Sequence, residues 1–296
     1  MKSKLEKLKN IDVPKSIKFK ESENSLILTM NSSCVNANMQ ENRAAFEAWA
    51  LVARAKGYDK VILEEEKNID VKSKEHYNRF LYRAYCFDKL FDWFILSDNL
   101  AKKVQEFYYK YFENKKLIYN VPINKAKEPI HPEAIAEEYF VNNKEITNEL
   151  LKTNVENFYS QLPVGTFYEK KSNSTRVFTG GKSAIDFWGI EGNILNIVEL
   201  KVKRNKSLGV LSELFFYVCL MRDFHIKKLA SPCTEEGIRG FNTIRNANLK
   251  MIKGYILTEN IHPQLEIAFE ELGKAFRNDK SIKFEKVVHI PENISY

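Results

Sequence analysis

An apolar segment from Ile194 to Val202 (ILNIVELKV) constrains the fold of this chain more than any other feature of its sequence. Branched aliphatic residues in such a run are typical of a strand buried in the middle of a sheet. The residues Glu191-Gly192-Asn193 come directly before it, and Gly and Asn tolerate the positive φ angles of tight hairpin turns. We therefore expect a central strand joined by a hairpin to an antiparallel neighbour at Ser183–Gly189.

The segments around this hairpin predict the rest of the sheet. One or two helices are expected over 132–161 and a strand over 164–170. After the hairpin, the pattern predicts helices over 207–222 and 262–277 and strands over 251–257 and 282–290. This order indicates an α/β (α+β) fold with a mixed central sheet flanked by helices.

The first part of the chain has a different pattern. Helices are expected over 42–56 and 74–112, the second with a break at Asp98-Asn99, and short strands over 25–30 and 60–63. The segment 120–132 carries three prolines and is the best candidate linker. We therefore expect two domains, a mainly helical module over 1–125 and an α/β domain over 126–296. The first would serve recognition, partner binding or homodimerisation.

The composition restricts the possible partners and surroundings. The chain has 296 residues, a net charge of +7 and a pI near 9.0, which is compatible with a nucleic-acid partner and equally with a solvated basic surface. No pair of its cysteines has the spacing of a zinc site. The longest apolar run, 214–221, is too short to span a bilayer, and no signal peptide opens the chain. We expect a cytoplasmic protein without a membrane partner.

Three charged residues on the predicted hairpin carry the chemistry. Glu199 and Lys201 are two apart on one strand and so face the same side, whereas Val198, Leu200 and Val202 face the other. The hairpin brings Asp186 onto the neighbouring strand, within cross-strand reach of Glu199. Buried carboxylates repel each other unless a cation lies between them, and hard oxygen ligands suit Mg²⁺. We expect Asp186, Glu199 and the main-chain carbonyl of Leu200 to bind Mg²⁺, with Mn²⁺ able to substitute.

The pattern Asp186-x12-Glu199-x-Lys201, on a hairpin followed by a helix, resembles the PD-(D/E)XK nuclease superfamily. The resemblance covers roughly 133–290 and does not extend to the first 120 residues. It implies a restriction-endonuclease-like fold and Mg²⁺-dependent hydrolysis of phosphodiester bonds, in DNA rather than RNA. In that family the acids bind the metal and a lysine acts on the hydrolytic water. The corresponding lysine here would be Lys201.

The resemblance also suggests supporting residues. Glu213 and Tyr217 are four apart on the following helix and occupy the place of a Gln-x-x-x-Tyr element, with Glu in place of Gln. The family often carries a further acid on the helix before the first strand, for which Glu156 is the candidate and Glu149 the alternative. Ile185 stands where the family name has proline, a departure common in the superfamily.

Less specific readings of the same residues stay open. Glu-x-Lys alone is common in a lysine-rich chain, so the hairpin could simply carry a surface salt bridge. Basic residues at Lys203, Arg204 and Lys206, and in the segment 237–253, could contact phosphates or lie in solvated loops. Functionally, the alternatives are a non-catalytic nucleic-acid-binding or scaffold protein that retains the fold, and a nuclease held inactive until a ligand or partner binds the first half.

Overall fold

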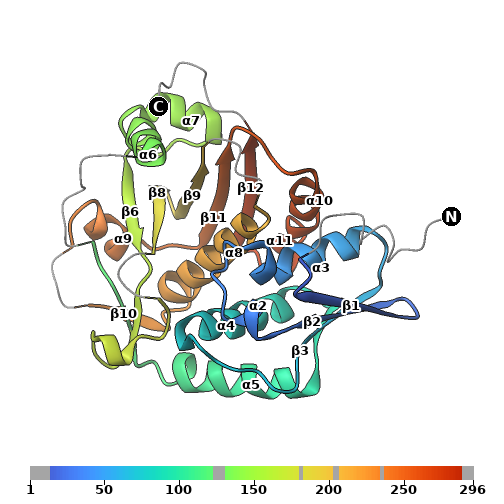
Figure 1. Cartoon of the computed structure of the whole chain (residues 1–296). Coiled ribbons are helices and arrows are strands. Elements are labelled where there is room, and N and C mark those ends of the chain that lie inside the picture. The colour runs from blue at the N-terminus through green and yellow to red at the C-terminus, as the bar shows by residue number, and fades with distance from the viewer. Residues whose placement is uncertain (1–13, 123–130, 180–182, 203–206, 234–236, 289–296) are drawn as a thin grey trace. The chain divides into compact units, whose positions relative to one another are not determined.

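The computed structural model describes residues 14–122, 131–179, 183–202, 207–233 and 237–288. They form a mixed α/β structure with three sheets, distributed over two compact units (Figure 1). The first unit comprises 1–114, 207–216 and 262–279, and the second comprises 115–206, 217–261 and 280–296. Each unit is therefore assembled from separate stretches of chain, whereas the sequence suggested one boundary near the linker.

The first unit is built on a four-stranded sheet of order β1-β2-β3-β4. β1 is antiparallel to β2, and β2, β3 and β4 are parallel. The strands are β1 (Ile17–Ser22), β2 (Ser25–Met30), β3 (Lys60–Glu65) and β4 (Phe94–Leu96). The helices are α2 (Ser32–Val35), α3 (Phe46–Ala55), α4 (Lys74–Leu90), α5 (Asp98–Tyr108), α10 (Pro263–Leu272) and α11 (Ala275–Asn278). The strands expected over 25–30 and 60–63 are confirmed as β2 and β3, whereas β1, β4 and the sheet that all four strands form were not expected in a mainly helical module.

One difference from the sequence analysis lies in the aromatic stretch expected as a helix over 74–112. α4 ends at Leu90 because Phe91 adopts an extended conformation, and Phe94–Leu96 then forms β4 on the edge of β3. The next helix, α5, begins at Asp98, where the sequence analysis expected a break. The aromatic rings are nevertheless core residues as expected, with Phe46 stacked on Phe94 at 6.0 Å between ring centroids.

The second unit is built on a five-stranded mixed sheet of order β12-β11-β9-β8-β6. β8 is antiparallel to both β9 and β6, while β9, β11 and β12 are parallel. The strands are β6 (Phe158–Pro163), β8 (Ala184–Glu191), β9 (Ile194–Lys201), β11 (Met251–Thr258) and β12 (Ile282–Val288). The predicted central strand and its hairpin are thus confirmed, because β9 is the middle strand and β8 is its antiparallel neighbour. Gly192 makes the turn between them with a φ of 59°.

A smaller sheet of order β10-β5-β7 also belongs to the second unit. It contains β5 (Leu117–Tyr119), β7 (Thr166–Tyr168) and β10 (Ala230–Pro232). The helices of the second unit are α6 (Pro132–Asn142), α7 (Lys144–Leu151) and α9 (Phe241–Asn246). Helix α8 (Gly209–Met221) starts in the first unit and ends in the second. The strand expected over 164–170 is therefore short and lies in the small sheet, not beside β8.

The core of the second unit fixes which face of the large sheet each residue takes. Ala136 and Phe140 of α6 pack in one buried cluster with Phe187 of β8 and with Val198 and Leu200 of β9. Aliphatic and aromatic side chains at every second strand position supply this face. The residues between them must face the other way, and those residues include Asp186 and Glu199.

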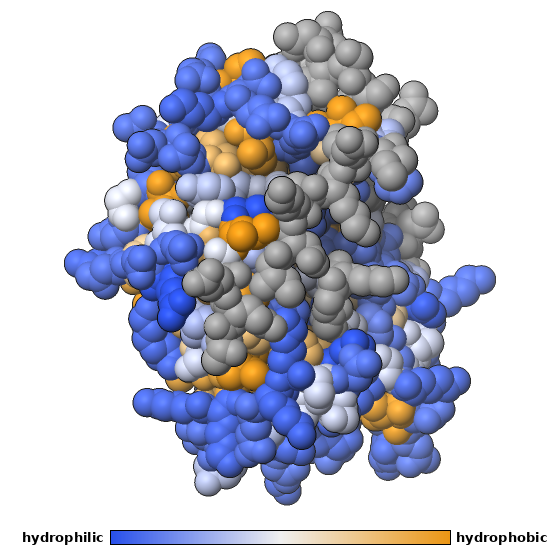
Figure 2. All heavy atoms as spheres, turned by 90° about the vertical axis from the view of Figure 1, so that its left-hand side faces the viewer, coloured by the Kyte–Doolittle hydropathy of each residue, from blue (hydrophilic) through white to orange (hydrophobic). Residues whose placement is uncertain are grey.

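The exposed surface is mostly polar. On the face seen in Figure 2, hydrophilic residues predominate and hydrophobic ones form small, separate groups. The large hydrophobic residues exposed in the described part of the chain are Val71, Ile95, Tyr109, Ile238 and Val288. Across the described residues, no helix combines the length and apolar character needed to cross a membrane.

Candidate functional site

The three residues singled out by the sequence lie at one end of the β8–β9 hairpin. Regular pairing of the two strands runs from the turn as far as Phe187 and Val198. If the same register continued by one step, it would pair Asp186 with Glu199. The regular backbone pairing ends before this step, and a side-chain contact is found there instead. An oxygen of the Asp186 carboxylate accepts a hydrogen bond from the backbone N–H of Leu200 at 2.7 Å. A carboxylate thus completes the hairpin where the backbone pairing stops.

Glu199 and Lys201 point to the same side of β9, as predicted. Lys201 Nζ lies 2.5 Å from Glu199 Oε1, and Leu200 between them is buried in the core on the opposite face. The Glu199 side chain is 2% exposed and the Lys201 side chain 11% exposed. Burial of this kind excludes a solvated surface pair, because an ion pair removed from water is costly unless it has a specific role or good partners.

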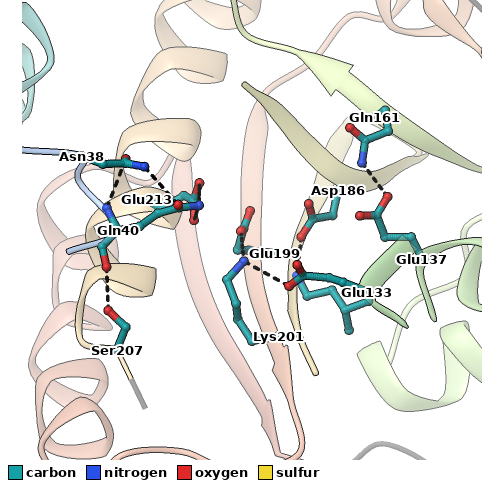
Figure 3. A network of polar contacts seen from close by, with 11 residues as sticks. Asn38, Gln40, Glu133, Glu137, Gln161, Asp186, Glu199, Lys201, Ser207 and Glu213 are labelled. Atoms are coloured by element: carbon teal, nitrogen blue, oxygen red, sulfur yellow. Dashed lines mark hydrogen bonds and ion pairs between the residues drawn. The ribbon is translucent and has the colours of Figure 1, made fainter. Parts of the chain in front are cut away.

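Helix α6 brings further acids to the same end of the sheet. Pro132 occupies the first turn, where its missing N–H costs nothing, and Glu133 is placed favourably for the helix dipole. Glu133 Oε1 lies 3.5 Å from Lys201 Nζ. The ammonium of Lys201 therefore has a carboxylate from its own strand and another from α6, as Figure 3 shows.

Glu137 lies one helical turn after Glu133 and is buried. Its Oε2 accepts a hydrogen bond from the side-chain amide of Gln161 on β6, at 2.5 Å (Figure 3). Burial, and next the nearby charge of Glu133, raise the pKa of Glu137 to about 7, against the lowering effects of Gln161 and Lys201. Glu137 therefore exchanges protons near neutral pH, which an ordinary carboxyl does not.

Gln161 has an unusual backbone for a strand residue. Its φ is 54°, in the left-handed region that a non-glycine side chain disfavours. Pairing between β6 and β8 holds on both sides of it, at Ser160 with Phe187 and at Leu162 with Ile185, but omits the row of Gln161 and Asp186. On both sides of β8, regular strand pairing is therefore missing at Asp186.

The structure does not place the expected supporting acid on a helix. Glu156 was expected on a helix before the first strand, but it is exposed in a bend between α7 and β6. The helix ends earlier, because Lys152 is left-handed with a φ of 54° and Asn148 hydrogen-bonds both main-chain groups of Val155. The alternative, Glu149, is on α7 and is also exposed. Helical acids do accompany the hairpin, but they are Glu133 and Glu137.

Glu213 and Tyr217 lie on α8, the helix predicted after the hairpin, and both are buried. Glu213 belongs to the first unit, where the side-chain amide of Gln40 donates to its two oxygens at 2.7 and 2.8 Å. Tyr217 belongs to the second unit. Their proposed support of the catalytic residues stays a prediction.

The basic segments have mixed outcomes. Lys203, Arg204 and Lys206 lie outside the described residues. In the segment 237–253, Arg245 and Lys250 are exposed, while Arg239 is partly buried and burial lowers its pKa. Gly240 is left-handed and packs so closely on the ring of Tyr159 that an added Cβ would lie 2.5 Å from it. Part of this segment is therefore packed structure and not a free loop.

The donor chemistry at the hairpin fits a hard cation. Asp186 and Glu199 offer carboxylate oxygens from adjacent strands, and Mg²⁺ is commonly bound by one or two carboxylates together with waters and substrate phosphate. In the part of the chain that is described, no group of three or more His, Cys, Asp or Glu side chains is placed to hold a metal ion. A two-carboxylate Mg²⁺ site is compatible with both observations, whereas a closed protein cage such as a structural zinc site is not.

Comparison with known proteins gives no identification. Neither the family models, nor the curated proteins, nor the solved structures include a match to this chain.

Sequence reasoning missed Glu133, Glu137 and Gln161. A usable signal existed for the two acids, because they are four apart at the start of a helix that follows a proline, and so share one face. No sequence signal indicates the left-handed conformation of Gln161, since glutamine is not a residue that favours it.

Proposed function

We propose that the second unit is a Mg²⁺-dependent nuclease of the PD-(D/E)XK type, which hydrolyses phosphodiester bonds in DNA in preference to RNA. The observation that carries this proposal is the meeting of Asp186, Glu199 and Lys201 at the open end of an antiparallel hairpin in a mixed sheet. Two acids and one lysine in this arrangement supply a cation site and a positive group beside it.

Each residue has a definite task in this proposal. Asp186 and Glu199 hold Mg²⁺, with the carbonyl of Leu200 as a further ligand, and the ion supplies an activated water and a Lewis acid for the phosphate. Lys201 orients the attacking water or balances the charge that develops on the phosphoryl oxygens. The contact of Lys201 with Glu133 holds its ammonium at the mouth of the hairpin.

The assignment of a nucleic-acid substrate rests on charge, whereas the preference for DNA comes from the family resemblance. A net charge of +7 favours association with a polyanion, and exposed lysines such as Lys170 and Lys171 lie on the chain between β6 and β8. Contacts of this kind position a phosphate backbone without reading its sequence. We therefore expect cleavage to depend on the structure of the DNA more than on particular bases. A cytoplasmic location belongs to the same proposal.

The test is a cleavage assay on the full chain with end-labelled single-stranded, duplex and branched DNA and with matched RNA. We expect cleavage with Mg²⁺ or Mn²⁺, none in EDTA, and none by the variants Lys201→Ala and Asp186→Asn. Lys116→Ala serves as the matched control, because Lys116 is an exposed lysine of the same unit whose carboxylate partner, Glu169, is also exposed. Cleavage that persists in EDTA or in both variants rules the proposal out.

A second candidate function is a nucleic-acid-binding or scaffold protein without catalysis. It is favoured by the short Glu199–Lys201 contact, because the ammonium already balances the charge of the Glu199 carboxylate. Calorimetry separates the candidates. DNA binding without any heat of Mg²⁺ binding supports the non-catalytic protein. Mg²⁺ binding without cleavage supports a nuclease that awaits a ligand or partner.

A further inference from the structure

The most unusual backbone at the candidate site is that of Gln161, whose φ of 54° interrupts an otherwise regular strand. A non-glycine residue in this region is strained, and strain of this kind persists only where the surrounding structure enforces it. The neighbours of Gln161 on β6 are paired with β8 on either side, so the irregularity is confined to one residue.

The direction of the side chain explains what the strain achieves. Ser160 pairs with Phe187, and Phe187 faces α6 in the core. Because side chains alternate along a strand, a regular residue at 161 would face away from α6. The left-handed conformation breaks this alternation, and the amide of Gln161 reaches the Glu137 carboxylate on α6 at 2.5 Å.

We propose that Gln161 is a positioning residue that holds the Glu137 carboxylate in place one helical turn after Glu133, and that the left-handed backbone is kept for this contact. The inference rests on the proposed nuclease function, because that function gives the charge around Lys201 a role in hydrolysis. Gln161 on β6 contacts Glu137, and the charges of Glu133 on its own helix and of Lys201 on β9 also act on it. Held there, Glu137 sets the charge around Lys201 according to its own protonation.

Three variants of the full chain separate the backbone from the amide. Gln161→Gly tolerates the left-handed backbone but has no amide, Gln161→Ala lacks both advantages, and Gln161→Asn keeps an amide that is one methylene shorter. We expect the Gly variant to melt at the same temperature as the wild type or higher, and the Ala variant to melt lower. The Gly variant would nevertheless cleave DNA about tenfold more slowly or worse, the loss expected for one hydrogen bond to a charged group.

The second readout is the titration of Glu137 followed by carbon-13 NMR, which does not depend on activity. The Gln161 amide stabilises the carboxylate, so its removal in the Gly and Ala variants is expected to raise the pKa of Glu137, and Asn is expected to restore the wild-type value only in part. Should the wild type neither bind Mg²⁺ nor cleave DNA, the nuclease proposal falls while this titration still tests the contact. An unchanged Glu137 titration in the Gly variant, or a Gly variant that melts below the Ala variant, overturns the inference.

Discussion

The Asp186 carboxylate accepts the backbone N–H of Leu200 at 2.7 Å, directly where the β8–β9 ladder ends. This contact fixes the position of the carboxylate that we propose to bind a cation. It also means that Asp186 has a structural task and a proposed chemical task, and the two can be separated by substitution.

We predict that Asp186→Ala lowers the free energy of unfolding by about 1–3 kcal/mol, because it leaves a backbone donor without its acceptor. Asp186→Asn keeps a side-chain oxygen for Leu200 and is expected to lose less. Both variants should fail to bind Mg²⁺ in calorimetry, since neither has the charge. Equal destabilisation by the two substitutions would show that the hydrogen bond contributes little.

The pair of Glu199 and Lys201 is expected to be strongly coupled. Lys201→Met removes the ammonium beside a carboxylate that is 2% exposed. We predict that it lowers the free energy of unfolding, measured by urea denaturation, by about 3 kcal/mol. Adding Glu199→Gln should recover at least half of that loss, because the buried charge is then gone. Strictly additive losses in this double-mutant cycle would contradict the prediction.

Glu137 makes stability depend on pH in a defined direction. Its pKa is raised from 4.5 to about 7 in the folded protein, so the folded state binds the proton more tightly than the unfolded state. Its stabilising contribution is complete below pH 4.5 and is lost as the pH rises to about 7. The free energy of unfolding of Glu137→Gln, relative to that of the wild type, should therefore be about 3 kcal/mol higher at pH 8 than at pH 4. A difference that does not vary with pH would refute this assignment.

A buried ion pair in the first unit offers a test that is independent of function. Arg83 donates to both oxygens of Glu47 at 2.8 and 2.9 Å, and Ser212 donates to the same carboxylate at 2.7 Å. Burial raises the pKa of Glu47, and Arg83 opposes this. We predict that Arg83→Met costs about 3–5 kcal/mol of unfolding free energy, and that combining it with Glu47→Gln recovers part of it. Urea denaturation of both variants provides the measurement.

Two glycines of the first unit form a matched pair. A Cβ on Gly209, at the start of α8, would lie 2.1 Å from the carbonyl oxygen of Gln40, whereas a Cβ on Gly273 would lie 3.5 Å from its nearest neighbour. Gly209→Ala should therefore lower the free energy of unfolding by about 1–3 kcal/mol, as overpacking does. Gly273→Ala should be neutral or slightly stabilising. Thermal melts in which the two variants behave alike would contradict the close approach.

The central hairpin could be predicted from sequence because each of its signals agrees with the others. The apolar run of β9, the Gly192 turn and the two-residue spacing of Glu199 and Lys201 all depend on local pattern. The expected segments and the observed strands differ by one or two residues at their ends.

The features that sequence did not predict depend on distant contacts. β4 has only three residues, and its existence depends on pairing with β3 more than thirty positions earlier. In the sequence, Glu137 looks like a solvent-exposed helix residue. Only the fold brings Gln161 of β6 into contact with it. The expected position of Glu156 depends on a first strand over 164–170, whereas β6 begins earlier, at Phe158.

The interleaving of the two units has a consequence for biosynthesis. The first unit needs residues up to 279, so it cannot be completed on the ribosome before most of the second unit has also been translated. Neither half of the chain can therefore fold to its final form as an early, independent fragment. Gene truncations near residue 125 would yield an N-terminal piece that lacks α10 and the first turns of α8, and such a piece should be prone to aggregate.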